Sequence, residues 1–185
     1  GQDGDGKGIY AQIFSSSGTK VGNGFLVNTV ITKDQNSPSV TALSNDTFII
    51  VWEGRDGNSN GAIQGQIFNN TGTKIGAEFQ IDSFNNGIHT YEITPCVTAL
   101  SGQFVVAWAS SYPYNLSDTY YNQDGNRRGI ILQIYNNNGT KIGGQIIGNT
   151  YTTGDQDSPS ITSLSNGNFV LAWTSSGPDA SGKSV

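Results

Sequence analysis

Hydrophobic residues of this chain fall in short runs that are rich in Ile, Val, Phe, Tyr and Trp and are bounded by Gly, Asn, Asp and Pro. Runs of this kind predict β-strands. The links 43–47 and 68–73 contain Asn, Asp and Gly, which suit the positive φ of tight hairpins. No stretch of about ten residues shows a helical period with caps, so we expect essentially no α-helix.

The pattern of runs occurs three times. Residues 8–14 read GIYAQIF, residues 61–68 read GAIQGQIF and residues 129–135 read GIILQIY. A second motif, Ser/Thr-Pro followed by Phe-x-x-x-Trp, lies at 37–52, 94–108 and 158–173. Gln12 and Gln133 are 121 residues apart (133 − 12), as are Trp52 and Trp173 (173 − 52). One period is therefore roughly 60 residues, which is typical of repeat architectures.

Each period predicts four strands, so the expected fold class is all-β with three tandem four-stranded antiparallel repeats. One unit spans 30–84, with strands at 38–43, 47–52, 62–68 and 78–81. The next spans 85–151, with strands at 95–100, 104–109, 129–135 and 145–147 and a surface-loop insert at 110–128. Segment 152–185 holds the first half of a further unit, with strands at 159–164 and 168–173. Segment 1–29 holds the strand pair that completes a unit, at 8–14 and 25–28.

The end of the sequence continues into its beginning in register. From Trp108 to Gly129 is 21 residues (129 − 108), and from Trp173 through the last residue to Gly8 is 20 (185 − 173 + 8). Either the chain closes on itself, or copies of it join head to tail. An unfinished two-stranded unit has a free edge, which invites strand addition. We expect copies of the chain as partners and a biological object longer than this chain.

These motifs resemble the tandem repeats of very large secreted or surface-exposed microbial proteins. Those repeats carry Gly-x-Tyr-x-Gln-x-Phe, Gly-x-x-x-Gly, Ser-Pro-x-Val-x-x-Leu and Phe-x-Val-x-Trp, and Gly8, Tyr10, Gln12 and Phe14 match the first pattern. The resemblance covers nearly the whole chain except the insert and the last residues. It implies β-propeller-like blades in the style of tachylectin and tectonin propellers. A closed propeller needs at least about four blades, so a β-trefoil and an open β-solenoid are the alternatives.

Composition excludes several classes of protein. Charged residues make up 12% of the chain and the net charge is −5, which argues against a nucleic-acid partner. No apolar run is long enough to span a bilayer. Cys96 is the single cysteine, so the chain is no disulfide scaffold. The low content of Lys and Glu suits exposure to proteases, and we expect an extracellular or cell-surface location.

The three tryptophans, Trp52, Trp108 and Trp173, end equivalent apolar runs. We interpret them as anchors that pack each repeat against its neighbour, because repeat units bury their apolar faces on one another. The alternative is sugar stacking on exposed indoles, as in lectins.

Acidic residues cluster in two kinds of loop, comprising Asp3, Asp5 and Asp124 in Asp-x-Asp/Asn-Gly segments, and Asp34, Asp155 and Asp157 before the Ser-Pro motif. Alternating oxygen ligands suit Ca²⁺. No complete EF-hand loop is present, and turns favour the same residues. We expect no cofactor, with Ca²⁺ as the alternative.

Four Asn-x-Ser/Thr sequons lie in predicted turns or in the insert, at Asn45, Asn69, Asn115 and Asn138. Glycans could project outward there. Glycosylation is expected if the protein passes through a eukaryotic-type secretory route.

Catalysis has little support in the sequence. Residues 57–61 read Gly-Asn-Ser-Asn-Gly, but a nucleophile elbow needs a preceding strand and a following helix, and here a strand follows. His89 is the single histidine and cannot serve several units. Cys96 lies where the other units have Ser39 and Ser160, so we expect a buried, inert thiol. We therefore expect no enzyme.

The leading hypothesis is a structural repeat module of an extracellular, glycosylated surface or filament-forming protein that assembles head to tail. The alternative is a carbohydrate-binding, lectin-like repeat module with shallow pockets between units.

Overall fold

A computed structural model describes residues 5–55, 61–82, 91–111 and 128–176 of the chain. These residues form β-strands and no α-helix, which confirms the all-β prediction. The strands are β1 (Tyr10–Phe14), β2 (Lys20–Leu26), β3 (Asn36–Ala42), β4 (Thr47–Arg55), β5 (Gly61–Asn69), β6 (Lys74–Gln80), β7 (Tyr91–Leu100), β8 (Gln103–Ser111), β9 (Arg128–Asn136), β10 (Lys141–Ile147), β11 (Gln156–Ser163) and β12 (Phe169–Ser175). Along the described ranges, no helix has the length and apolar character needed to cross a membrane.

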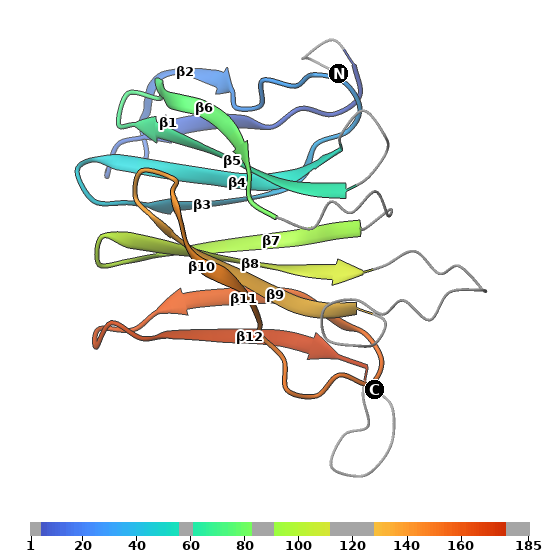
Figure 1. The fold of residues 1–185 in the computed structure, drawn as a ribbon. Helices are drawn as coiled ribbons and strands as arrows, with labels where there is room; N and C mark the ends of the chain where they lie inside the picture. Colours follow the sequence, from blue (N-terminus) through green and yellow to red (C-terminus); the bar gives the residue numbers. More distant parts are fainter. Residues whose placement is uncertain (1–4, 56–60, 83–90, 112–127, 177–185) are drawn as a thin grey trace.

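The strands pair into four antiparallel sheets. Two are complete, with the order β3-β4-β5-β6 in the first complete sheet and β7-β8-β9-β10 in the second. The others are the N-terminal half-sheet, β1-β2, and the C-terminal half-sheet, β11-β12. The described residues therefore form sheets of two, four, four and two strands, so the prediction of three four-stranded repeats holds only in part. The two half-sheets lie at opposite ends of the array, so their strands cannot pair within one chain (Figure 1).

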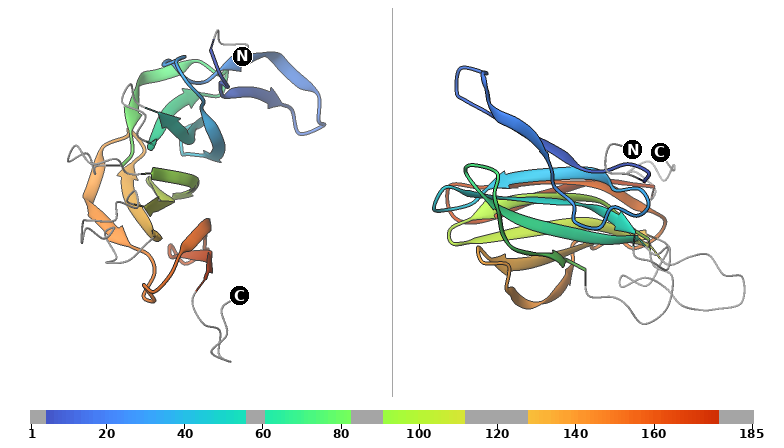
Figure 2. Two further views of the ribbon diagram at one scale, coloured as in Figure 1. Left: turned by 90° about the vertical axis from the view of Figure 1, so that its right-hand side faces the viewer. Right: turned by 90° about the horizontal axis from the view of Figure 1, so that it is seen from above.

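The four sheets follow one another along an open arc (Figure 2). The repeat pattern makes β1 equivalent to β5 and β9, and β12 equivalent to β4 and β8. The N-terminal half-sheet thus corresponds to the last two strands of a complete sheet, and the C-terminal half-sheet to the first two. The first strands of successive sheets, β3, β7 and β11, are neighbours.

The main hydrophobic core lies between the two complete sheets. Ile49, Val51 and Ile63 of the first complete sheet share this cluster with Phe104 and Val106 of the second. β-branched side chains pack well on a pleated surface. Full burial of each such side chain contributes about 1.5–3 kcal/mol. Two smaller clusters join the complete sheets to the half-sheets.

A repeated glutamine accounts for strands that begin earlier than predicted. The Gln66 Nε2 donates to the carbonyl oxygens of Ile67, at 3.0 Å, and Ile75, at 3.2 Å. These bonds span a β-bulge, where Gly76 has φ 69°. The sequence predicted a strand at 78–81, whereas β6 begins at Lys74. Equivalent bonds are made by Gln12 and Gln133.

Candidate functional site

Two strand edges have no partner strand among the described residues. β1 pairs with β2 alone, whereas its equivalents β5 and β9 each pair on both sides. β12 pairs with β11 alone, whereas its equivalents β4 and β8 each pair on both sides. The edges that join β4 to β5, and β8 to β9, therefore recur on β12 and β1, and these two strands lie at opposite ends of the array (Figure 1). Unpaired edges are templates for strand addition.

Side chains that are buried in the complete sheets are exposed at these two ends. Phe14, on β1, is 55% exposed, whereas its equivalents Phe68 and Tyr135 are both 0% exposed. Val170, on β12, is 48% exposed, whereas its equivalents Ile49 and Val105 are both 0% exposed. Residue type alone does not account for the difference, because all six positions carry large hydrophobic side chains. Grouped exposed apolar surface is typical of an interaction site.

An apolar groove of about 560 Å³ lies between the N-terminal half-sheet and the first complete sheet. Phe25 lines one side, and Val40, Phe48 and Ile50 line the other. At the next interface, Phe104 and Val106, which are equivalent to Phe48 and Ile50, are covered by side chains of β4. The groove is therefore the place where the first two strands of a sheet would lie.

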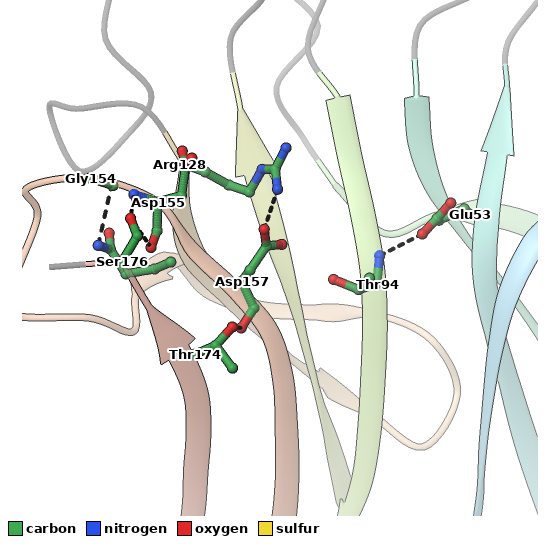
Figure 3. Close-up of polar contacts among 9 residues, drawn as sticks. Glu53, Thr94, Arg128, Gly154, Asp155, Asp157, Thr174 and Ser176 are labelled. Carbon is green, nitrogen blue, oxygen red and sulfur yellow. Dashed lines mark hydrogen bonds and ion pairs between the residues drawn. The ribbon is translucent and has the colours of Figure 1, made fainter. Parts of the chain in front are cut away.

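Polar contacts join neighbouring sheets at one end of the strands (Figure 3). The Thr94 N–H, on β7, donates to the Glu53 Oε1, on β4, at 2.6 Å. Thr94 has φ 51° at a β-bulge before Pro95. Arg128, on β9, forms an ion pair with Asp157, on β11. Both of these interfaces between successive sheets thus combine apolar packing with a polar contact from strand to strand.

The three tryptophans differ in burial. Trp52 and Trp108 are fully buried, whereas Trp173 is partly exposed. Trp52 shares a cluster with Ile9 and Val27, which flank the strands of the N-terminal half-sheet. Each buried indole therefore lies between its own sheet and the preceding one, which is the position expected of an anchor. Their energetic role remains a prediction.

The acidic loop residues hold backbone groups and a guanidinium. Asp5 accepts a hydrogen bond from the Lys33 N–H at 3.2 Å, and Asp34 accepts one from the Lys7 N–H at 2.9 Å. The Asp155 N–H donates to the Ser176 hydroxyl at 2.6 Å. Asp3 and Asp124 lie outside the described residues. Within the described ranges, no group of three or more His, Cys, Asp or Glu side chains could hold a metal ion. The loops that contain Asp5 and Asp34 lie against each other through the hydrogen bonds from Lys33 and Lys7, in which the carboxylates bind backbone N–H groups.

Three of the four sequons can be located. Asn45 and Asn138 are exposed in turns, and Asn69 is half-buried at the end of β5. The Asn69 Oδ1 accepts a hydrogen bond from the Thr71 N–H at 3.0 Å. Asn115 lies outside the described residues. Asn45 and Asn138 are thus accessible to solvent, and their glycosylation stays a prediction.

A buried carboxylate was missed by the sequence analysis. The Asp82 Oδ1 accepts a hydrogen bond from the Ile63 N–H at 2.8 Å, and Asp82 is buried. Burial raises its pKa above the ordinary value, against hydrogen bonds from Gln80 and Ile63 that lower it. Asparagine takes the place of Asp82 in the other units, where the Oδ1 atoms of Asn28 and Asn149 accept hydrogen bonds from the equivalent backbone N–H groups. Asn28 and Asn149 recur at the repeat spacing, and this recurrence was the available signal.

The remaining candidates have limited reactivity or lie outside the described residues. Cys96 is half-buried on β7, and burial raises the pKa of its thiol to about 11. A thiol with such a pKa is protonated near neutral pH and is a poor nucleophile. His89 and most of the Gly-x-Ser-x-Gly match at 57–61 lie outside the described residues.

No family model matches the sequence, and no curated protein matches it. Similar solved structures include Trypanosoma rangeli sialidase in complex with 2,3-difluorosialic acid, a covalent intermediate, with a TM-score of 0.53 and 12% identity. That match covers 92% of this chain and 30% of the sialidase chain. A second structure of Trypanosoma rangeli sialidase has a TM-score of 0.43, 12% identity, and covers 92% of this chain and 23% of its own. The first likeness shows a β-propeller-like fold, in which the sheets are blades. It does not support the expectation that the chain is no enzyme.

Proposed function

We propose that this chain is a structural repeat module of an extracellular, glycosylated surface protein, and that its copies assemble head to tail by completing a split blade. The C-terminal half-sheet of one copy supplies the first two strands of a blade. The N-terminal half-sheet of the next copy supplies the last two. The same blade forms between separate chains and between consecutive copies on one longer chain.

The observation that carries this proposal is the matched exposure at the two ends. Phe14 and Val170 are exposed, and every equivalent of these residues is fully buried in a complete blade. Joining β12 to β1 removes both side chains from water and pairs both free edges. Burial of apolar area is the main driving force for such association. The extracellular location is supported by the small share of charged residues, 12% of the chain. Glycosylation is supported by the exposure of Asn45 and Asn138.

A variant at the split blade tests head-to-tail assembly. Ala172 is exposed on β12, whereas its equivalents Val51 and Ala107 are fully buried. Ala172→Lys therefore leaves the isolated fold intact and places a charge in the completed blade, where burial is costly. Asn23→Lys is the matched control, because Asn23, Ala77 and Gly144 are exposed in all three units.

Sedimentation over a concentration series provides the measurement. We expect the wild-type chain and Asn23→Lys to associate and Ala172→Lys to remain a monomer with an unchanged circular dichroism spectrum. A wild-type chain that stays monomeric at every concentration would contradict the proposed function.

A lectin-like function is the second candidate, favoured by the fold likeness to a sialidase in complex with a sialic acid derivative. Titration with sialic acid and a panel of neutral sugars tests it, with Trp173 fluorescence in a Trp52→Phe, Trp108→Phe background as the signal. Saturable binding to one sugar would favour this candidate. Hydrolysis of a fluorogenic sialoside by the wild-type chain would show an enzyme and overturn both candidates.

A further inference from the structure

We propose that two copies of this chain close into a single ring of six blades, in which two blades are shared between the copies. This inference rests on the proposed head-to-tail assembly and adds its stoichiometry and symmetry. The partner is one further copy, related by a two-fold axis, and not a growing series of copies.

The number of blades per copy sets the size of the ring. The described residues form two complete blades and two complementary halves, which together make three blades. Closed propellers have about four to eight blades. One copy falls below this range and three copies exceed it, so two copies are the number that fits. A heterologous contact forms a closed ring when its rotation closes, and a filament when it does not.

The complete blades define the register of the shared blades. Phe48 lies opposite Phe68 where β4 pairs with β5, and Phe104 lies opposite Tyr135 where β8 pairs with β9. Neither ladder contains a register shift. Transfer by the repeat spacing places Phe169 of one copy opposite Phe14 of the other. The same transfer places Val170 opposite Ile13, Ala172 opposite Ala11, and Trp173 opposite Tyr10.

An aromatic pair recurs at this register. The rings of Phe48 and Phe68 are stacked with centroids 5.3 Å apart, and the rings of Phe104 and Tyr135 are stacked at 5.1 Å. The corresponding residues are Phe169, on β12, and Phe14, on β1. These two strands lie at opposite ends of the array (Figure 1). A second copy thus supplies to the aromatic rings of Phe14 and Phe169 the stacking partner that the complete blades contain.

The lining of the apolar groove indicates which strand would fill it. When β12 of the partner copy pairs with β1, Val170 and Ala172 of that strand face the groove wall that contains Phe48 and Ile50. The equivalent contact within one chain joins Ile49 and Val51 to Phe104 and Val106 in the main core. The groove is therefore suited to a strand of this chain's own sequence.

Directed disulfide formation tests the ring. The variant Ala11→Cys, Ala172→Cys is prepared with Cys96→Ser, a change that copies Ser39 and Ser160 of the other units. Residues opposite each other on paired strands are within disulfide reach, whereas diagonal residues are about 7–8 Å apart and exceed it. Ile13→Cys with Ala172→Cys, in the same background, is the out-of-register control.

The outcomes separate the ring from head-to-tail assembly in general. Oxidation that yields only a covalent dimer, in the in-register variant and not in the control, supports the ring. A ladder of covalent oligomers overturns the ring but leaves the proposed function standing. A cross-linked monomer, or no cross-link in a folded chain, overturns both. If the variants do not fold, native mass spectrometry of the wild-type chain decides. A dimer that does not grow with concentration supports the ring, larger assemblies overturn it, and a lone monomer overturns both.

Discussion

Replacement of Trp52 by alanine should destabilise the chain strongly, because its indole is 0% exposed and fills the space between the first complete sheet and the N-terminal half-sheet. Removing a fully buried Trp costs about 3–5 kcal/mol. The Trp52 Nε1 lacks a hydrogen-bond partner among the described residues, and an unpaired buried donor costs about 1–3 kcal/mol. Since truncation also removes this unpaired donor, we expect a value near the lower end, about 3 kcal/mol.

Trp173→Ala supplies the internal comparison. Trp173 occupies the equivalent position in the C-terminal half-sheet and is partly exposed. We expect a loss of about 1–2 kcal/mol in the monomeric Ala172→Lys background. In the wild-type background we expect weaker association as well. Urea unfolding followed by far-ultraviolet circular dichroism measures both losses without relying on tryptophan fluorescence. Equal losses for Trp52→Ala and Trp173→Ala in the monomer would refute the reasoning, because burial would then not set the cost.

Three further predictions concern the repeated polar contacts. Burial raises the pKa of Asp82, so the contribution of its carboxyl group to stability is fully present below the ordinary pKa and is lost as pH rises through the pKa in the folded chain. In urea unfolding, Asp82→Asn should therefore be more stable than wild type at pH 7, and this difference should vanish toward pH 4. A difference that stays constant with pH would contradict this prediction. Gln66→Ala should lower the free energy of unfolding by about 1–3 kcal/mol, because its Nε2 donates to the carbonyl oxygens of Ile67 and Ile75. Gln12→Ala, at the half-buried equivalent position, should lower it less. Thermal or urea unfolding that ranks the two losses in reverse would contradict this stabilising role of the glutamine. Chelation with EDTA should leave the melting temperature unchanged, because Asp34 accepts a hydrogen bond from the Lys7 N–H and Asp157 forms an ion pair with Arg128. A loss of several degrees that Ca²⁺ restores would identify a structural metal site.

The local structure follows largely from the sequence. Alternation of β-branched runs with Asn- and Gly-containing turns specifies hairpins, since both strand preference and turn conformation depend on neighbouring residues. Recurrence of Gln12 as Gln133, and of Trp52 as Trp173, at the same spacing is enough to identify equivalent strands. The all-β class and the antiparallel order within each sheet were predictable for this reason.

The local sequence pattern gave the wrong start for β6, the strand that contains a β-bulge. A strand was predicted at 78–81, whereas β6 begins at Lys74 and contains Gly76 with a positive φ. The side chain that stabilises this bulge, Gln66, is on the neighbouring strand. A contact between strands decides the conformation, so the start of β6 is not encoded by the residues around it alone.

The tertiary structure alone decided which equivalent residues are buried. Phe14 and Phe68 belong to the same sequence motif, yet one is 55% exposed and the other 0% exposed. Similarly, Asp82 takes the place of Asn28, and its burial in the folded chain raises its pKa. Burial depends on which sheets lie on either side, and this is a property of the array. The sequence therefore determines what each strand can pair with, and the arrangement of sheets determines which pairings one chain leaves unmade.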